Sequence, residues 1–551
     1  MAMARSRETL MRQLPRLTPY LLLSGLLAVV LFAILRRTGG ELIYSMDDPF
    51  IQLALSEQLF RGHYGINPDE VSSPSSSILW PFLLVATVPT WLHKLTPLFL
   101  CWASAMGFIW ALRRLLVVSE LSDGRDLLGS IGPVIIAVVL NSIGLVFLGM
   151  EHMAHVMVCT LIALGLVTLE DGPNQRLQWW FVAALLLCPW LRYEGLAVTG
   201  LACLFLIWRG HTKAACIIGG ISLAVVIGFS LFLVGIGLPA LPSSVLVKTD
   251  ADGLLENWPT ALWTMVTEPA RVATLALGFC FAWVAVFNRD KRTRGLALFG
   301  AGVAAAQVIA GQYGGFARYG VYHFAVLLAM GVFLCRRRLG VFVVRYGQWA
   351  AMAGLCLLAI PFLSYVSATA RTPRAAADIY TQQYQMHRFA TRFHHGPIAV
   401  NDLGCVAYRN PEHVVDLWGL GSESARLARA SGDDDPAWIE RATSAHGVKV
   451  AMVYETWFAE LPASWQRLAL VRNPSAHEIS AEDTVSVLLV DPHYEQAAIR
   501  ELEAFAQTVP SETQVQVLRG REERSLLVPL GALGCALRGS CGDHDEHAVG
   551  D

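Results

Sequence analysis

Long apolar stretches alternate with short polar segments over the first two-thirds of the chain. Each stretch approaches the roughly 20 residues that an α-helix needs to cross the hydrocarbon core of a bilayer, and together they predict about eleven spans. The first, at about 18–35, follows a basic segment with no small-residue cleavage site, which predicts a retained anchor with its N-terminus inside. The other stretches lie at about 78–92, 96–112, 128–148, 153–169, 177–191, 195–208, 214–237, 271–287, 295–311, 320–334 and 348–366.

Basic clusters between these stretches predict the orientation, because Lys and Arg are concentrated in cytoplasmic loops. The clusters are Arg113 with Arg114, Arg209 with Lys213, Arg289 to Arg294, and Arg336, Arg337 and Arg338 with Arg345. The loops that then lie outside are 36–77, 149–152, 192–194, 238–259 and 312–319. An odd number of crossings must separate 36–77 from Arg113, whereas hydropathy offers two stretches. We therefore expect 78–92 or 96–112 to be short, re-entrant or continuous with the other.

From about residue 367 the charge rises and the long apolar stretches end. Strand-like and helical patterns alternate, which predicts a small external α/β domain over 367–535, followed by a disordered tail at 536–551. Asp402 and Asp416 stand at strand ends, where turn chemistry is expected. The predicted fold is therefore an α-helical polytopic membrane bundle over 1–366 with a small C-terminal periplasmic α/β domain. The strand-like pieces are IAVNDLGCVAY, HVVDLWGL, VKVAMVYE and TVSVLLV, and the helical ones are SESARLARA and EQAAIRELEAFAQ.

Composition narrows the class of protein. Hydrophobic residues make up 54% of the 551 residues and charged residues only 16%, with a net charge of −2. These values exclude an ordinary soluble enzyme and a nucleic-acid binder with a basic face. Cys535 and Cys541 could pair in an oxidising compartment or stay as free thiols. No Cys/His cluster has the sequence spacing of a zinc site, and His155 is interpreted as a packing histidine on an apolar face.

The loop 36–77 carries the first candidate chemistry. Asp48-Pro49 is typical of a helix start, with Asp48 as N-cap, and the apolar and polar residues that follow suit a helix at the membrane surface. Asp47 has no such structural duty, so it is either a solvated loop carboxylate or a base. Adjacent carboxylates near an apolar surface repel each other and resist ionisation, which makes a usable base.

Other polar residues stand at the predicted outer ends of spans. Ionisable groups flanked by apolar runs either pair with one another or line a polar cavity. The serines before ILWPFLL either cap the next span or, as hydroxyls at a helix N-terminus, form a seat for phosphate. The candidates are Glu151, His152, Arg192, Glu194, Lys248, Arg318, Tyr319 and His323, together with Ser75, Ser76 and Ser77.

The segment MDDPFIQLALSEQLFRGHYGINPDEVSSPSSSILWPFLL resembles the first external loop of the GT-C membrane glycosyltransferases. These enzymes use polyprenyl-phosphate sugars. GMEH, LRYEG, LP-x-S-x-x-x-K and an Arg opening a late span fit a bacterial branch, and the layout is most similar to the terminal arabinofuranosyltransferases of mycobacteria. The tail segments VNDLGCVAY and VVDLWGL also look like the external domain of that branch.

The resemblance implies an inverting glycosyltransferase on the outer face of the bacterial inner membrane. Asp47 would be the catalytic base with Asp48 beside it, although Asp-Asp-Pro replaces the Asp-Glu of several members and leaves open which carboxylate faces the acceptor. Arg318 and Lys248, with Arg192 also available, would contact the donor phosphate, and Glu151 or Glu194 would contact or orient the sugar. The acceptor could be a glycan, a lipid or a protein. The chemistry requires no metal or other cofactor, while the acids near Asp47 permit a divalent cation.

Two other function classes stay open from the sequence. The first is a transporter or flippase of lipid-linked sugars. Against it, the sequence lacks the pair of broken spans in matching halves and the midplane charges that are expected of this class. The second is a non-catalytic partner in glycan assembly, in which the loop and the tail only bind polymer. Neither class involves nucleic acid.

Overall fold

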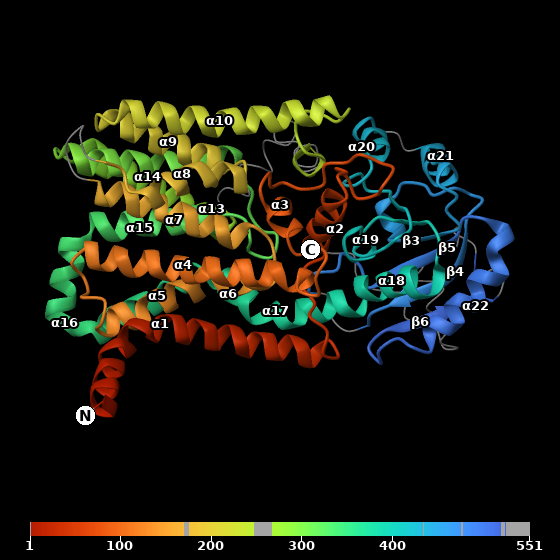
Figure 1. Cartoon of the computed structure of the whole chain (residues 1–551), viewed down its shortest axis with the longest axis horizontal. Coiled ribbons are helices and arrows are strands. Elements are labelled where there is room, and N and C mark those ends of the chain that lie inside the picture. The colour runs from red at the N-terminus through yellow and green to blue at the C-terminus, as the bar shows by residue number, and fades with distance from the viewer. Residues whose placement is uncertain are drawn as a thin grey trace, which may run out of the picture. The chain divides into compact units, whose positions relative to one another are not determined.

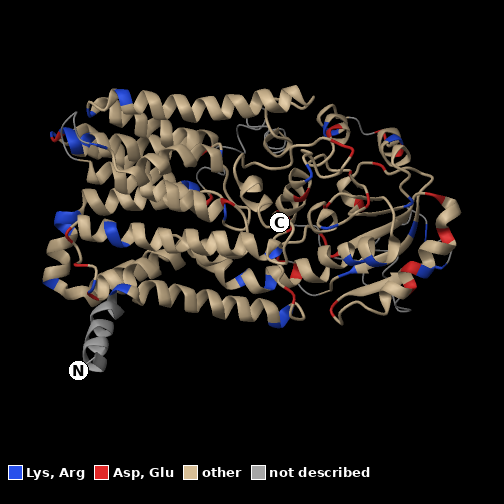
Figure 2. Ribbon diagram, in the orientation of Figure 1, with Lys and Arg blue, Asp and Glu red and all other residues tan. Residues whose placement is uncertain are grey.

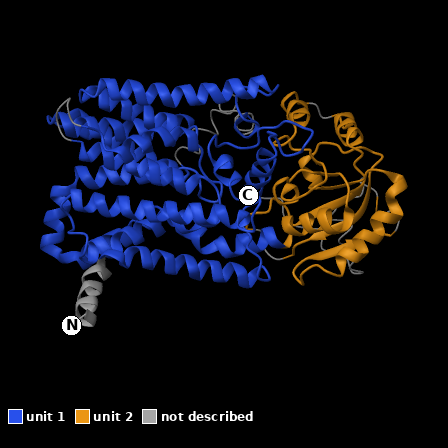
Figure 3. Ribbon diagram, in the orientation of Figure 1, with its two compact units in different colours: residues 1–380 blue, residues 381–551 orange. Residues whose placement is uncertain are grey.

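The computed structural model describes residues 2–169, 176–246, 267–432, 435–474, 478–519 and 524. The chain divides into two compact units, residues 1–380 and 381–551 (Figure 3). The first unit is a bundle of helices, and the second is built on a sheet (Figure 1). The change of composition at about 367 falls within α17 (Leu363–Thr381).

Unit 1 is almost entirely helical. Apolar residues cover most faces of its helices, as expected for segments surrounded by lipid or by one another. Its other helices are α1 (Ala2–Arg37), α2 (Asp48–Phe60), α3 (Trp80–Val85), η1 (His93–Leu95), α4 (Thr96–Val118), α5 (Leu127–Val139), α6 (Ser142–Leu148), α7 (His152–Thr168), α8 (Trp179–Leu191), α9 (Gly195–Trp208), α10 (Thr212–Gly235), α13 (Pro269–Phe287), α14 (Lys291–Ala310), α15 (Val321–Leu334) and α16 (Arg336–Leu357).

Several of these helices could cross a membrane. In the described part of the chain five are long and apolar enough, and the pair α5 and α6, bent by 58°, would be a sixth. The helices α7, α8, α9 and α15 are also apolar but have only 13 to 17 residues. These helices support a multi-pass membrane protein, whereas the predicted count of about eleven spans stays a prediction.

The helix α3 accounts for the conflict between the charge rule and hydropathy. It has six residues and is therefore about 9 Å long, too short to cross a bilayer. The following span runs from His93 to Val118. One crossing, rather than two, thus separates the loop 36–77 from Arg113. Figure 2 also shows Lys and Arg gathered at the end of unit 1 where α16 lies, as the charge rule expects.

The bend between α5 and α6 lies at Asn141, which has a left-handed backbone (φ 53°). Its side-chain amide donates to the carbonyl oxygens of Phe316 and Ala317, at 3.5 and 3.2 Å, and its side-chain oxygen accepts from Thr369 Oγ1 at 2.8 Å. Phe316 and Ala317 also have positive φ angles. The buried Asn141 therefore fixes the loop that precedes α15.

Unit 2 contains a six-stranded mixed sheet in the order β2-β1-β3-β5-β4-β6. The strand β1 is parallel to β2 and β3, and the remaining pairs are antiparallel. The four strand-like pieces named from the sequence contain β1, β2, β3 and β5, and the two helical pieces contain α20 and α22. The elements of unit 2 are α18 (Gln383–Phe389), η2 (Ala390–His394), β1 (Ile398–Val400), α19 (Gly404–Ala407), β2 (Val414–Asp416), α20 (Glu423–Ala430), α21 (Ala437–Ala445), β3 (Val450–Val453), η3 (Glu455–Trp457), β4 (Gln466–Arg472), β5 (Thr484–Leu489), η4 (Pro492–Tyr494), α22 (Glu495–Ala506) and β6 (Gln514–Val517).

Asp416 closes the turn after β2. Its carboxylate accepts the backbone N–H of Trp418 at 2.8 Å and that of Gly421 at 2.6 Å. Gly419 has a φ of +95°, and a Cβ there would lie 2.7 Å from the backbone of Arg426, so only glycine fits. Burial raises the pKa of Asp416 to about 6, although the backbone N–H groups of the turn lower it. The structure therefore gives Asp416 the turn function expected from the sequence.

Candidate active site

The polar residues singled out in unit 1 stand at helix ends that meet at one end of the bundle, here called the site end. The helix α7 starts directly after Glu151, α8 ends directly before Arg192, and α9 starts directly after Glu194. These short antiparallel connections place the polar residues side by side, although each is flanked by apolar helix. The helix α15 begins after Gly320, so Arg318 also stands at a helix start.

The first acidic pair lies at the N-terminus of α2. Asp47 occupies the N-cap position without a side-chain capping bond and is 7% exposed. Asp48 is the first helical residue, one position later than the cap assigned from the sequence. Its carboxylate instead accepts a hydrogen bond from Arg318 Nη1 at 2.5 Å. The expectation that Asp48 caps the helix is therefore wrong, because an ion pair with a distant residue takes up its carboxylate.

Arg318 is held on several sides. Its Nη1 lies 3.0 Å from the sulfur of Met46 and 3.6 Å from that of Met150, while Nη2 donates to the hydroxyl of Tyr319 at 2.9 Å. The guanidinium also stands 4.8 Å from the centre of the Tyr319 ring. The side chain is 8% exposed. Arg318 thus presents a fixed positive charge beside the acidic pair.

A second ionic cluster is centred on Arg192. Its guanidinium donates to Glu151 at 2.7 Å and to Glu194 at 2.6 Å, and lies 3.0 Å from His152 Nε2. Glu151 is fully buried. Burial alone would raise the pKa of Glu194, but the Arg192 guanidinium lowers it to about 2. Both carboxylates are therefore ion-paired, as one of the two sequence interpretations expected.

Tyr319 joins the two clusters. Its ring lies beneath the guanidinium groups of Arg318, at 4.8 Å, and Arg192, at 5.7 Å. Between the clusters is a small polar cavity of about 10 Å³, room for about one water. Its lining residues are His152, His155, Val156, Arg192, Glu194, Gln307, Gln312, Arg318, Tyr319, Gly320 and Tyr322. The second sequence interpretation, a polar cavity, therefore holds as well.

The serines before α3 have mainly structural contacts. Ser75 and Ser77 are buried, and Ser76 is half-buried. The Ser77 hydroxyl accepts the backbone N–H of Trp80 at 3.1 Å, which satisfies the start of α3. The backbone N–H of Leu79 donates to the carbonyl oxygen of Trp190 at 3.0 Å, which places this start beside the C-terminus of α8. The capping interpretation of Ser77 agrees with these contacts.

Some predicted residues lie outside the described residues. They are Lys248, Cys535, Cys541 and the tail 536–551. His152 and Tyr319, which the sequence placed at outer ends of spans, both line the polar cavity. Two other residues of the site, Gln307 and Tyr322, were not among the sequence candidates. Gln307 lies on α14, and no local sequence pattern marks it as a site residue. Its side-chain oxygen accepts a hydrogen bond from the Tyr322 hydroxyl at 2.7 Å.

A large apolar cavity of about 750 Å³ begins near the site end. Phe324, in the first turn of α15, lines it, as does Leu140 next to the bend at Asn141. The cavity continues along α15 as far as Cys335. Its walls come from α4, α5, α13, α15 and α16, and almost every lining residue is hydrophobic.

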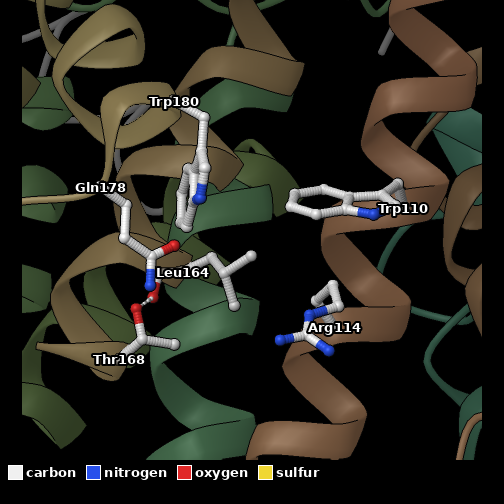
Figure 4. Close-up of a pocket in the computed structure, with 6 residues that line it drawn as sticks. All are labelled: Trp110, Arg114, Leu164, Thr168, Gln178 and Trp180. Atoms are coloured by element: carbon white, nitrogen blue, oxygen red, sulfur yellow. Dashed lines mark hydrogen bonds between the residues drawn. The ribbon is translucent and has the colours of Figure 1, made fainter.

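A different cavity of about 290 Å³ lies far from the acids. Figure 4 shows Trp110 and Trp180 across from each other, with Leu164 between them and Arg114 below Trp110. Leu164 is 13 residues after Glu151 along α7, a rise of about 20 Å. This cavity therefore belongs to the opposite end of the bundle and not to the candidate site.

The acids near Asp47 do not form a metal-binding set within the described residues. Three or more His, Cys, Asp or Glu ligand atoms converge in two places, neither of which contains Asp47, Asp48 or Glu151.

Comparison with known proteins gives few matches. A family model described as a domain of unknown function, DUF8728, matches residues 376–488. None of the curated proteins matches the chain.

The solved structures to which the chain is similar include the following three. The oligosaccharyltransferase of Archaeoglobus fulgidus in complex with Zn and sulfate is 11% identical, with a TM-score of 0.43, over 84% of this chain and 74% of that chain. The same organism's AglB with an inhibitory peptide and a dolichol-phosphate is 11% identical, with a TM-score of 0.42, over 87% and 77%. ArnT from Cupriavidus metallidurans bound to undecaprenyl phosphate is 9% identical, with a TM-score of 0.44, over 85% and 98%. With TM-scores below 0.5, these similarities do not assign a function.

Proposed function

We propose that this protein is an inverting glycosyltransferase that moves a sugar from a polyprenyl-phosphate donor to a hydroxyl group of a cell-envelope acceptor. The reaction would take place on the outer face of the bacterial inner membrane. The observation that carries the proposal is the pairing of Asp48, in the loop 36–77, with Arg318, which brings two adjacent carboxylates and a buried cation together.

The two carboxylates would have different functions. Asp48 is ion-paired with Arg318, and a guanidinium weakens a carboxylate as a base by stabilising its charge. Asp47, which is adjacent and largely buried, is therefore the group that we assign as general base. It would take the proton of the acceptor hydroxyl while that oxygen attacks the anomeric carbon and the bond to the phosphate oxygen breaks. A single displacement of this kind inverts the configuration at that carbon.

The leaving group is a lipid phosphate, whose negative charge must be stabilised. In the two ionic clusters, four carboxylates, those of Asp47, Asp48, Glu151 and Glu194, stand against the guanidinium groups of Arg192 and Arg318. A phosphate therefore needs further positive charge, and Lys248 on the 238–259 loop is the residue that we assign to supply it with Arg318. The apolar cavity of about 750 Å³ would hold the first isoprene units of the donor chain.

The experiment is sugar transfer by membranes that contain the full-length protein, supplied with a panel of polyprenyl-phosphate sugars. Loss of the general base in Asp47→Asn should lower turnover by about 10²–10⁴-fold at normal protein level. Asp290→Asn is the matched control, since Asp290 only caps α14 through the Thr293 N–H and should leave turnover unchanged. Full activity of both Asp47→Asn and Asp48→Asn would refute the proposed mechanism.

The competing functions are separated by different measurements. A flippase would move the labelled donor across the bilayer of a sealed proteoliposome without forming a glycosidic bond. A non-catalytic assembly partner would form no product from any donor, yet would bind polymer equally well with and without the Asp47→Asn substitution.

A further inference from the structure

A cluster of two cysteines and one histidine lies inside the bundle, away from the acidic pair. His155 and Cys159 are one turn apart on α7, and Cys188 stands on the adjacent helix α8. One ligand atom from each, the two sulfurs and a ring nitrogen, lie within 4.8 Å of one another. All three side chains are buried, being at most 1% exposed. The sequence spacing alone did not indicate this cluster, because its third member comes from another helix.

The spacing of the two sulfur atoms is close to that in a tetrahedral zinc site. The two sulfur atoms are 3.5 Å apart. Zn–S bonds of about 2.3 Å at the tetrahedral angle require a separation of roughly 3.8 Å. A disulfide, in contrast, requires about 2.05 Å. The two thiols are therefore near the separation that a shared zinc ion demands, and they share a hydrogen bond but no covalent bond.

A second observation also points to a ligand. The His155 ring shares a hydrogen bond with the Cys188 side chain, and its buried Nε2 atom has no hydrogen-bond partner among the described residues. An imidazole nitrogen in this condition costs free energy unless something binds it. The His155 ring is held by the Tyr322 ring, whose centre lies 4.7 Å away. Its position is thus fixed before any ion arrives, as a preformed ligand requires.

Charge favours zinc over a monovalent soft metal. Thiolates and imidazole select Zn²⁺ or Cu⁺. Two thiolates and a neutral imidazole around Zn²⁺ give a neutral centre, whereas Cu⁺ would leave one negative charge in an apolar interior. Since burying an uncompensated charge is costly, the divalent ion is the better occupant. The polar cavity that His155 also lines has room for about one water, which could complete the tetrahedron.

We propose that His155, Cys159 and Cys188 bind one zinc ion that links α7 to α8. Binding would release the two thiol protons and form two Zn–S bonds and one Zn–N bond. His155 is one turn from Glu151, and Cys188 is one turn from Arg192. The ion would therefore lock together the two helix ends whose ion pair forms the wall of the candidate site. This structural function is independent of the proposed transfer reaction.

The test uses the full-length protein, purified in detergent without a histidine tag and dialysed against zinc chloride and then against buffer. Wild type should retain about one zinc per chain by elemental analysis, and Cys159→Ser and Cys188→Ser should retain at least about tenfold less. Cys101→Ser is the matched control, because Cys101 is equally buried and contacts only the Met150 carbonyl oxygen at 3.1 Å through its sulfur. It should retain the wild-type content. A strong chelator should lower the melting temperature of wild type and of Cys101→Ser, but not that of Cys188→Ser.

Two results would overturn the proposal. One is wild-type protein that retains no zinc above the level of the cysteine variants. The other is a Cys159–Cys188 disulfide, found by mass spectrometry after alkylation without reductant, which would identify a redox pair instead. If the cysteine variants do not accumulate, X-ray absorption of the zinc-loaded wild type decides, since a first shell without two sulfurs would refute the assignment.

Discussion

Replacing Arg192 by Met should destabilise unit 1 more than any single exposed substitution. The guanidinium has contacts with both Glu151 and Glu194, and it is only 5% exposed. Its removal leaves the fully buried Glu151 carboxylate without its counter-charge. Breaking a buried ion pair from one side costs about 3–5 kcal/mol. This corresponds to a shift of the unfolding equilibrium by about 10²–10³-fold or more.

The double variant Arg192→Met with Glu151→Gln tests the cause. If the cost arises from an unpaired buried charge, neutralising Glu151 should recover part of it, so that the double variant is more stable than Arg192→Met alone. Arg192→Lys should fall between wild type and Arg192→Met, because one ammonium cannot reproduce the fork that reaches both carboxylates.

The assay is equilibrium unfolding of the full-length protein in mixed detergent micelles, followed by tryptophan fluorescence. Arg271→Met is the matched control, since Arg271 pairs with Glu268 at the same 2.7 Å, but with side chains 23% and 35% exposed. Its loss should cost about 0–1 kcal/mol. A cost for Arg192→Met below about 1 kcal/mol, or a double variant no more stable than Arg192→Met, would refute the reasoning from burial.

Three further predictions concern the cavity, the sheet unit and the site end. Gly331→Leu should raise KM for long-chain donors but not for short-chain analogues in transfer assays, because a side chain at Gly331 enters the apolar cavity; Gly228→Leu, on open surface, is its control. Burial raises the pKa of Asp416 to about 6, so the folded state favours the protonated carboxyl group. The free energy of unfolding of unit 2 should therefore fall by on the order of 3 kcal/mol as the pH rises from about 4 through 6. Denaturant unfolding of the full chain should show this loss in wild type and not in Asp416→Asn. Gly149→Ala should lower the melting temperature, because Gly149 has a φ of +66° and a Cβ there would lie 2.6 Å from the Tyr44 ring.

Local patterns predicted much of the fold. The helices α4 to α10 and α13 to α15 coincide with apolar stretches because burial and lipid contact act on every residue of a span. Strands β1, β2, β3 and β5 were found because each is a short apolar run next to turn residues. The strands β4 and β6 were missed; QVQV is polar and half-buried, as is usual at a sheet edge. The charge rule was right about the segment 78–92, where hydropathy alone misled.

The pairing of side chains could not be predicted in the same way. Asp48 and Arg318 are 270 residues apart, and no local pattern connects them. Asn141, whose left-handed backbone ties the bend to the loop before α15, has no sequence signal except its residue type. His155 and Cys159 do show a helical spacing of four, but Cys188 becomes their neighbour only through the packing of α7 on α8.

The helices that support the candidate site are shorter than a bilayer is thick. The helix α8 has 13 residues and α15 has 14, so they extend only about 20–21 Å across a hydrocarbon core of about 30 Å. The surrounding lipid must therefore become thinner beside them, or water must enter above Arg192 and Arg318. The depth of the polar site below the headgroups is thus set by the thickness of the host membrane. In the proposed transfer reaction, lipid acyl-chain length would then control how an acceptor from the aqueous side reaches the acidic pair.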